Sequence, residues 1–147
     1  MNILLVRVKP PKESINLQSF MICEPLELEY AASALKAEGH DVTLIDMLIE
    51  KRRFAYFLKN PYKTFDMVCF TAYINLIGAV KSYAREVKSY DPGILTVVGG
   101  VHAEVVPTDF VCPEIDHILW ANGIDTLCRI ARGERSPDGV FIPGKTT

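Results

Sequence analysis

Two consecutive glycines, Gly99 and Gly100, are the residues of this sequence best placed to let a ligand approach the main chain. They follow residues 94–98, an unbroken apolar run that is typical of a strand buried on both faces of a parallel sheet. In open α/β sheets, ligands bind beyond the carboxyl ends of the strands, and glycines there leave no Cβ in the way. The pair therefore predicts a binding site, although by itself it is equally compatible with a plain tight turn.

Other residue types that do chemistry are scattered. The cysteines stand far apart with no CxxC pair, which favours reduced, mostly buried thiols over a disulfide framework or a zinc site, and we expect no bound metal. They are Cys23, Cys69, Cys112 and Cys128. The basic run at residues 51–53 has the composition to grip phosphates, but a solvated charge cluster is the interpretation we favour.

Strands and helices alternate along the chain, which indicates a three-layer α/β sandwich. Apolar runs predict strands at residues 3–6, 41–46, 66–70, 94–98 and 116–120. Helical patterns fill most of the intervals, and a long loop at residues 13–23 follows the first strand. Five strands favour a flavodoxin-like (Rossmann-like) parallel sheet of order 2-1-3-4-5. We expect one domain over residues 1–132 and a polar tail or connector over residues 133–147.

Composition limits the partners of the chain. Its 147 residues suffice for one domain with a real core, and 49% hydrophobic with 23% charged residues is typical of a globular protein. The net charge of −2 gives no broad basic field for nucleic acid or an anionic membrane. There is no apolar run of about 20 residues, the length that spans a bilayer, and no signal-peptide core at the amino terminus. We therefore expect a cytoplasmic location.

Three common ligand sites of α/β sheets are missing from the sequence. A dinucleotide site needs glycines after the first strand, where this chain has Lys9, Pro10 and Pro11, and a flavodoxin phosphate loop is missing there too. Asp46 ends the second strand and, without those glycines, is better interpreted as a cap than as a ribose ligand. A phosphoacceptor domain needs Asp at the end of the third strand, where Thr71 stands. A nucleotide-binding enzyme using the same edge stays open by fold analogy alone.

Several motifs, in order, resemble one family. They are EPLELEYAA at residues 24–32, KAEGHDV at 36–42 with Asp46, TAY at 71–73, VGGVHA at 98–103 and FIPG at 141–144. Together they resemble the cobalamin (vitamin B12)-binding domain of the branch found at the amino terminus of many radical S-adenosylmethionine enzymes. The last motif resembles the connector that leads into the iron–sulfur barrel of those enzymes.

The resemblance implies a cobalamin held above the carboxyl edge of the sheet, with its corrin toward a partner domain. Gly99 and Gly100 would leave room for the nucleotide tail, Thr71 would hydrogen-bond to it and Tyr73 would flank it. A bulky residue at Gly100 should then abolish binding and leave the fold intact. The resemblance implies these cofactor-binding residues: Lys9, Pro10, Thr71, Ala72, Tyr73, Gly99, Gly100, Val101, His102, Asn122 and Gly123.

The sequence departs from the family pattern in two places. The DxHxxG motif that ligates cobalt is missing, and residues 7–23 contain no histidine, so no first-loop histidine would reach the cobalt. The Gly-Glu-Gly-Glu turn after the fifth strand reads Ala121-Asn122-Gly123-Ile124 here, without either acid. His102, beside the glycine pair, is better interpreted as a locally hydrogen-bonded loop histidine than as a cobalt ligand.

The resemblance thus implies an auxiliary domain that binds cobalamin for a radical S-adenosylmethionine enzyme, with methyl transfer or a carbon-skeleton reaction as the chemistry of the parent. The CxxxCxxC triad of an iron–sulfur cluster is missing from these 147 residues, so we expect no catalysis from this chain alone. The cluster and S-adenosylmethionine would belong to a downstream partner domain, and the chain would be a piece of a longer enzyme or a stand-alone remnant. The alternative is an α/β interaction or regulatory module that kept the fold and lost the cofactor.

Overall fold

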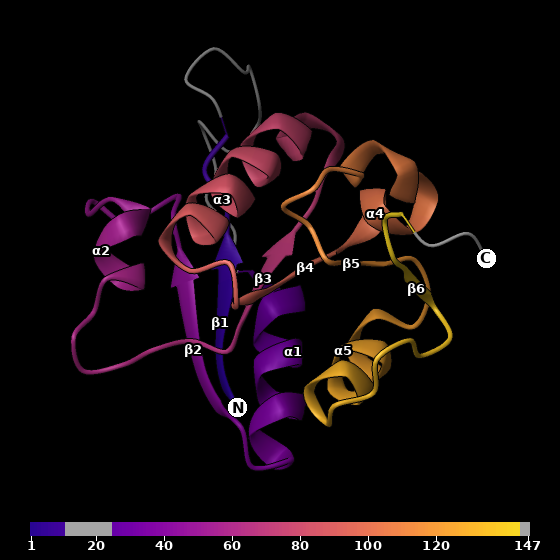
Figure 1. The fold of residues 1–147 in the computed structure, drawn as a ribbon, viewed down its shortest axis with the longest axis horizontal. Coiled ribbons are helices and arrows are strands. Elements are labelled where there is room, and N and C mark those ends of the chain that lie inside the picture. Colours follow the sequence, from indigo (N-terminus) through magenta and orange to yellow (C-terminus); the bar gives the residue numbers. More distant parts are fainter. Residues whose placement is uncertain (11–24, 145–147) are drawn as a thin grey trace.

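A computed structural model describes residues 1–10 and 25–144, in which strands and helices alternate around one sheet (Figure 1). The strands are β1 (Asn2–Arg7), β2 (Asp41–Asp46), β3 (Met67–Thr71), β4 (Leu95–Gly99), β5 (His117–Leu119) and β6 (Val140–Phe141). The α-helices are α1 (Leu26–Ala37), α2 (Phe54–Leu58), α3 (Ile77–Tyr90), α4 (Val101–Val105) and α5 (Gly123–Ala131). Two 3₁₀ turns, η2 (Ile74–Leu76) and η3 (Pro107–Phe110), complete the described elements.

The sheet has the order β2-β1-β3-β4-β5-β6. Its first five strands are parallel, because a connection crosses over between each pair, and they lie in the predicted order. The sixth strand corrects the expectation of a purely parallel, five-stranded sheet. Val140 and Phe141 pair antiparallel with Leu119 and Ile118, inside the stretch expected to be a tail. A strand of two residues carries no periodicity that a sequence pattern could detect.

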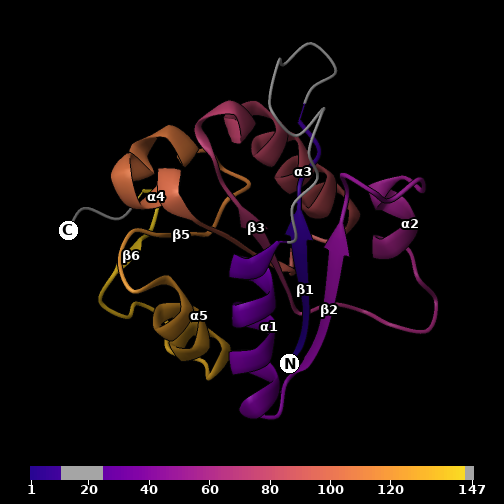
Figure 2. The ribbon, with the colours of Figure 1, turned by 180° about the vertical axis from the view of Figure 1, so that it is seen from behind.

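Alternate side chains of the buried strands pack into two separate hydrophobic cores, one on each face of the sheet. On one face of the sheet, Leu4, Val68 and Phe70 pack with α2, α3 and η3. On the other face, Leu5 and Cys69 pack with α1 and α5, which lie side by side (Figure 1, Figure 2). The two-residue period of the strands thus explains how an unbroken apolar run supplies both layers.

Helix α1 follows the predicted pattern. Its buried residues are Leu28, Ala31, Ala32 and Leu35, the stripe that the i, i+3, i+4, i+7 spacing indicates. Pro25 occupies the N-cap, and the chain leaves the helix through Gly39 with φ of 90°. The stripe places the first turn of α1 beside the carboxyl edge of the sheet.

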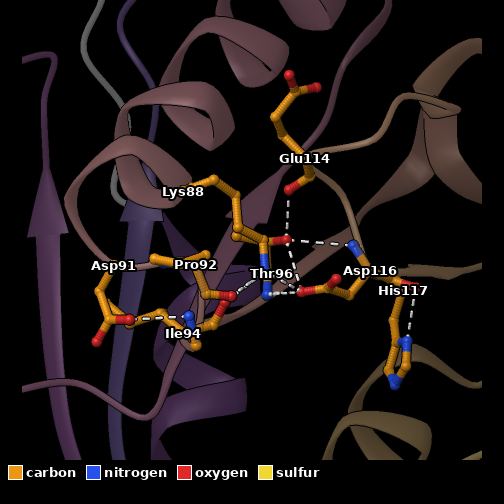
Figure 3. A network of polar contacts seen from close by, with 9 residues as sticks. Lys88, Asp91, Pro92, Ile94, Thr96, Glu114, Asp116 and His117 are labelled. Atoms are coloured by element: carbon orange, nitrogen blue, oxygen red, sulfur yellow. Dashed lines mark hydrogen bonds and ion pairs between the residues drawn. The ribbon is translucent and has the colours of Figure 1, made fainter.

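At the amino edge of the sheet, a polar network joins the end of α3, the start of β4 and the segment before β5 (Figure 3). Lys88, near the end of α3, donates to the carbonyl of Ile94 at 2.7 Å and to Asp116 Oδ2 at 2.6 Å. The same carboxylate accepts from the backbone N–H of Thr96 at 2.9 Å, and the hydroxyl of Thr96 donates to the carbonyl of Glu114 at 2.6 Å. This network satisfies polar groups of three segments, and a concave surface of about 390 Å³ lies beside it.

Candidate functional site

A cavity of about 510 Å³ opens at the carboxyl edge and extends between the sheet and helices α1 and α5. Its walls are apolar side chains of four strands and both helices: Leu5, Cys69, Val97, Leu119, Leu28, Ala31, Ile124 and Leu127. Its rim carries Glu27, Thr71, Gly99, Gly100, Glu104, Asn122 and Gly123. An apolar pocket of this size with a few polar groups at one end is typical of a small-molecule or cofactor site.

The two glycines of the rim serve different purposes. Gly99 is the last residue of β4, and a Cβ there would meet only the flexible end of Leu119, at 3.3 Å from Cδ1. Gly100 has φ of 107°, and a Cβ there would lie 3.0 Å from the backbone nitrogen of Ala72 and 3.1 Å from its carbonyl oxygen. The main chain itself therefore needs glycine at position 100. A bulky residue at Gly100 would therefore strain the main chain, contrary to the expectation that it would leave the fold intact.

The hydroxyl of Thr71 is the polar group that most clearly fits a ligand. The residue ends β3, is only 8% exposed and lines the cavity. Its Oγ1 is buried and has no hydrogen-bond partner among the residues that the structure describes. A buried polar group without a partner costs about 1–3 kcal/mol. A bound molecule that offered a donor or an acceptor here would recover that cost.

Besides Asp125 in the first turn of α5, two carboxylates line the cavity at its rim. Glu27, in the first turn of α1, and Glu104, in α4, both line the cavity. Partial desolvation raises the pKa of Glu27, the neighbouring Glu104 raises it further, and a hydrogen bond with Tyr73 opposes the rise. Glu104 Oε1 lies 3.9 Å from the position of a Cβ on Gly123, so α4 brings a carboxylate to the turn where the expected acids are missing. The rim can accept hydrogen bonds from amide or hydroxyl donors.

The structure divides the expected site residues into two groups. Five line the cavity: Thr71, Gly99, Gly100, Asn122 and Gly123. Six do not: Lys9, Pro10, Ala72, Tyr73, Val101 and His102. Ala72 acts through its main chain, which donates to the carbonyl of Gly99 at 2.8 Å and accepts from the N–H of His102 at 3.2 Å. The expected loop at residues 13–23 lies outside the described residues.

His102 is held by its own segment. Its Nε2 lies 2.7 Å from Asp109 Oδ2, and its ring packs edge-on against Phe110 with 5.7 Å between the centroids. The interpretation as a locally hydrogen-bonded histidine is confirmed. Asp46 is likewise engaged, since it accepts from the N–H of Leu48 at 3.0 Å and forms an ion pair with Arg7. Asp46 thus closes the turn after β2 and does not cap a helix, since the next helix begins at Phe54.

Sequence reasoning missed the walls of the cavity and both rim carboxylates. The alternation along the strands could have assigned Leu5, Cys69 and Val97 to one face, but not which pairs of helices leave a gap above it. Glu27 lies in the first turn of α1, where the helix dipole alone would account for an acid. Glu104 lies in a helix of five residues whose orientation depends on the turn at Gly100.

The thiols of the described residues give no sign of reactivity. Cys69, Cys112 and Cys128 are unpaired, and burial raises the pKa of each. No group of three or more His, Cys, Asp or Glu side chains gathers as a metal site within residues 1–10 and 25–144. In the same residues, no helix combines the length and the apolar character needed to cross a membrane.

Comparison with known proteins decides the family. The model of the B12-binding domain matches residues 15–131, which is most of the chain. This chain belongs to the B12-binding domain family. The matched residues include all strands from β2 to β5 and the whole rim of the cavity, so the family assignment and the cavity concern the same part of the molecule.

Two longer proteins are similar to this chain over part of their length. The hopanoid C-3 methylase of Methylococcus capsulatus is 34% identical over 148 residues, which cover 92% of this chain and 28% of the relative. An uncharacterized methyltransferase of Pyrococcus horikoshii is 33% identical over 127 residues, covering 84% of this chain and 27% of the relative. The chain thus matches little more than a quarter of the length of each relative.

Proposed function

We propose that this B12-binding domain holds cobalamin at the carboxyl edge of its sheet, as the auxiliary domain of a radical S-adenosylmethionine enzyme that transfers a methyl group. The observation that carries the proposal is the buried hydroxyl of Thr71, which lines a ready-made apolar cavity and has no partner in the described residues. Such a group fits a ligand that reaches into the cavity and supplies a hydrogen bond there.

Each part of the site has a separate task in this proposal. The walls around Leu5, Val97 and Leu127 exclude water and accept an uncharged, flat part of the cofactor. Thr71 hydrogen-bonds to that part, and the carboxylates of Glu27 and Glu104 accept hydrogen bonds from donors that stay at the rim. When bound, cobalamin supplies a cobalt centre that can carry a methyl group.

The parent reaction is proposed from the relatives. Both carry names that state methyl transfer, and both are several times longer than this chain. A longer enzyme with a downstream radical S-adenosylmethionine domain would agree with the connector-like FIPG motif at residues 141–144. Since residues 7–23 contain no histidine, the cobalt would have no histidine ligand from the first loop.

The test is retention of the cofactor. The purified chain is incubated with hydroxocobalamin, desalted and examined by visible absorption, and we expect corrin absorbance to stay with the protein. Thr71→Val removes only the hydroxyl and should weaken binding about fivefold, the equivalent of one hydrogen bond. A folded wild-type protein that stays colourless at high cofactor concentration would refute the proposal.

A second pair of variants tests the place of binding. Ala31→Leu adds bulk to a helical wall of the cavity, whereas Ser33→Leu adds the same side chain to the exposed side of the same helix. We expect Ala31→Leu alone to lose corrin absorbance while both keep the helical circular dichroism of the wild type. Equal retention by the two variants would place the cofactor elsewhere.

The alternative is an interaction or regulatory module that has lost the cofactor. The turn at Ala121–Ile124 favours it, because Asn122 and Ile124 stand where the resemblance leads one to expect acids, and Asn122 adopts φ of 50°. The same spectrum distinguishes the two functions, since such a module would bind no corrin at any concentration.

A further inference from the structure

Helix α2 lies at the β2 edge of the sheet, away from β6 (Figure 1, Figure 2). A further concave surface lies beside this helix. It encloses about 570 Å³ and is formed by one short segment of the chain. Its lining residues, which we call the α2 groove, are Arg53, Ala55, Tyr56, Lys59, Asn60, Pro61 and Tyr62. The lining contains two basic side chains and two tyrosines, and no carboxylate.

The segment that carries the groove is strongly basic. Residues 49–63 hold five of the 16 Lys and Arg residues of the chain but only one of its 18 Asp and Glu residues. The single acid, Glu50, is paired with Arg52, and Lys63 is paired with Asp41. Lys51, Arg53 and Lys59 are exposed. The chain-wide net charge of −2 therefore conceals a positive surface at this edge.

Large apolar side chains are exposed beside these charges. Tyr62 is 95% exposed, Ile49 63% and Tyr56 57%. Tyrosine and aliphatic tips next to lysine and arginine are the composition of surfaces that lie in the headgroup region of a bilayer. Exposed aromatic rings among basic residues thus point to a ligand that is both anionic and partly apolar.

The helix under the groove is firmly anchored. Phe54 and Leu58, on the inner side of α2, are buried in the core, and the ring of Phe54 lies 4.8 Å from that of Tyr83 in α3. On the outer side, the guanidinium of Arg52 lies 4.6 Å from the ring centroid of Tyr56. The basic and aromatic groups are therefore presented on a fixed platform.

We propose that the α2 groove and its flanking residues bind the surface of a membrane that contains anionic phospholipid. Arg53 and Lys59 contact headgroup phosphates, and Tyr62 enters the interface between headgroups and acyl chains. A nucleic acid fits less well, because Arg52 already covers Tyr56, and the basic side chains are confined to one short segment instead of forming a track. The proposal does not depend on cobalamin binding.

The experiment is sedimentation of the intact chain with vesicles. We expect it to sediment with phosphatidylcholine vesicles that contain phosphatidylglycerol, not with phosphatidylcholine alone, and to be released by salt. The variant Arg53→Glu/Lys59→Glu should bind at least about tenfold more weakly, since one basic side chain at such a surface is worth about fivefold. Lys36→Glu/Arg135→Glu changes the charge equally at exposed positions outside the groove and should bind as the wild type does.

A further variant tests the apolar contribution. Tyr62→Ser keeps every charge and should still reduce binding several-fold. Circular dichroism checks that the variants fold, which we expect because the changed side chains are exposed. Failure of the wild type to sediment, equal losses in the two charge variants, or binding to a single-stranded oligonucleotide in place of vesicles would each overturn the proposal.

Discussion

Thr71 and Thr96 are buried on neighbouring strands, β3 and β4, with opposite hydrogen-bonding states. Thr71 pairs with Gly99 and Thr96 with Val68, so the two threonines lie three positions apart and face opposite sides of the sheet. The hydroxyl of Thr96 donates to Glu114 and accepts from the N–H of Asp116 (Figure 3), whereas the hydroxyl of Thr71 has no partner in the described residues. The hydroxyl of Thr96 thus joins β4 to the segment before β5, and the hydroxyl of Thr71 is available to a ligand.

This contrast predicts different costs for the same substitution. Thr96→Val should destabilise the protein by about 1–3 kcal/mol, because it leaves the carbonyl of Glu114 without its hydroxyl donor, whereas the N–H of Asp116 keeps its bond to the Thr96 carbonyl. Thr71→Val should instead raise the stability of the free protein by about 1 kcal/mol, because it removes a buried hydroxyl that has no partner among the described residues. Urea unfolding of both variants measures the difference, and equal costs would contradict it.

Gly100 should be irreplaceable for a structural reason. Gly100→Ala puts a side chain on a left-handed residue and against the backbone of Ala72, so we expect a loss of about 1–3 kcal/mol in the free energy of unfolding. Gly78→Ala is the matched control, since this residue lies in α3 with open space around its Cβ, and it should gain about 0.5–1 kcal/mol. Guanidinium unfolding gives both values. A neutral Gly100→Ala would mean that the turn can rearrange.

The ion pair between Arg7 and Asp46 joins β1 to β2 with both side chains less than 10% exposed. Arg7→Ala should lower the free energy of unfolding by about 3–5 kcal/mol, because it leaves the buried carboxylate of Asp46 without its positive partner. Arg132→Ala, which breaks an exposed ion pair with Glu38, should have little effect on the unfolding midpoint. If the two variants unfolded at the same denaturant concentration, the buried ion pair would contribute no more to stability than the exposed one, and the prediction would be wrong.

Glu27 should make stability depend on pH. Its pKa is raised in the folded state, so between the unfolded and the folded pKa the native protein holds more protons than the unfolded chain. Stability therefore falls as the pH rises through that window, and Glu27→Gln should reduce the fall and raise stability at neutral pH. Glu29→Gln removes a carboxylate from the same turn of α1 but away from the cavity, which controls for the helix dipole. Thermal unfolding across the acidic range measures the slopes, and identical slopes for the two variants would contradict the prediction.

The order of the five parallel strands was predictable, because each strand is a short apolar run and each crossover contains a helical pattern or a turn signal. The buried stripe of α1 was equally local, whereas the ion pair of Asp46 with Arg7 depends on the pairing of β1 with β2. Strand β6 was not predictable, because two residues gain their order only by pairing with β5.

The sequence by itself determined that a strand of a parallel α/β sheet would end in two glycines at the carboxyl edge. Strand periodicity and turn residues are local features, which neighbouring positions in the sequence specify. Only the tertiary structure decided what those glycines do. Gly99 borders a cavity and Gly100 makes room for Ala72, a distinction that depends on residues 28 positions apart in the chain. The same is true of the rim carboxylates, since Glu27 and Glu104 reach one cavity only after α1 and α4 have packed on the sheet.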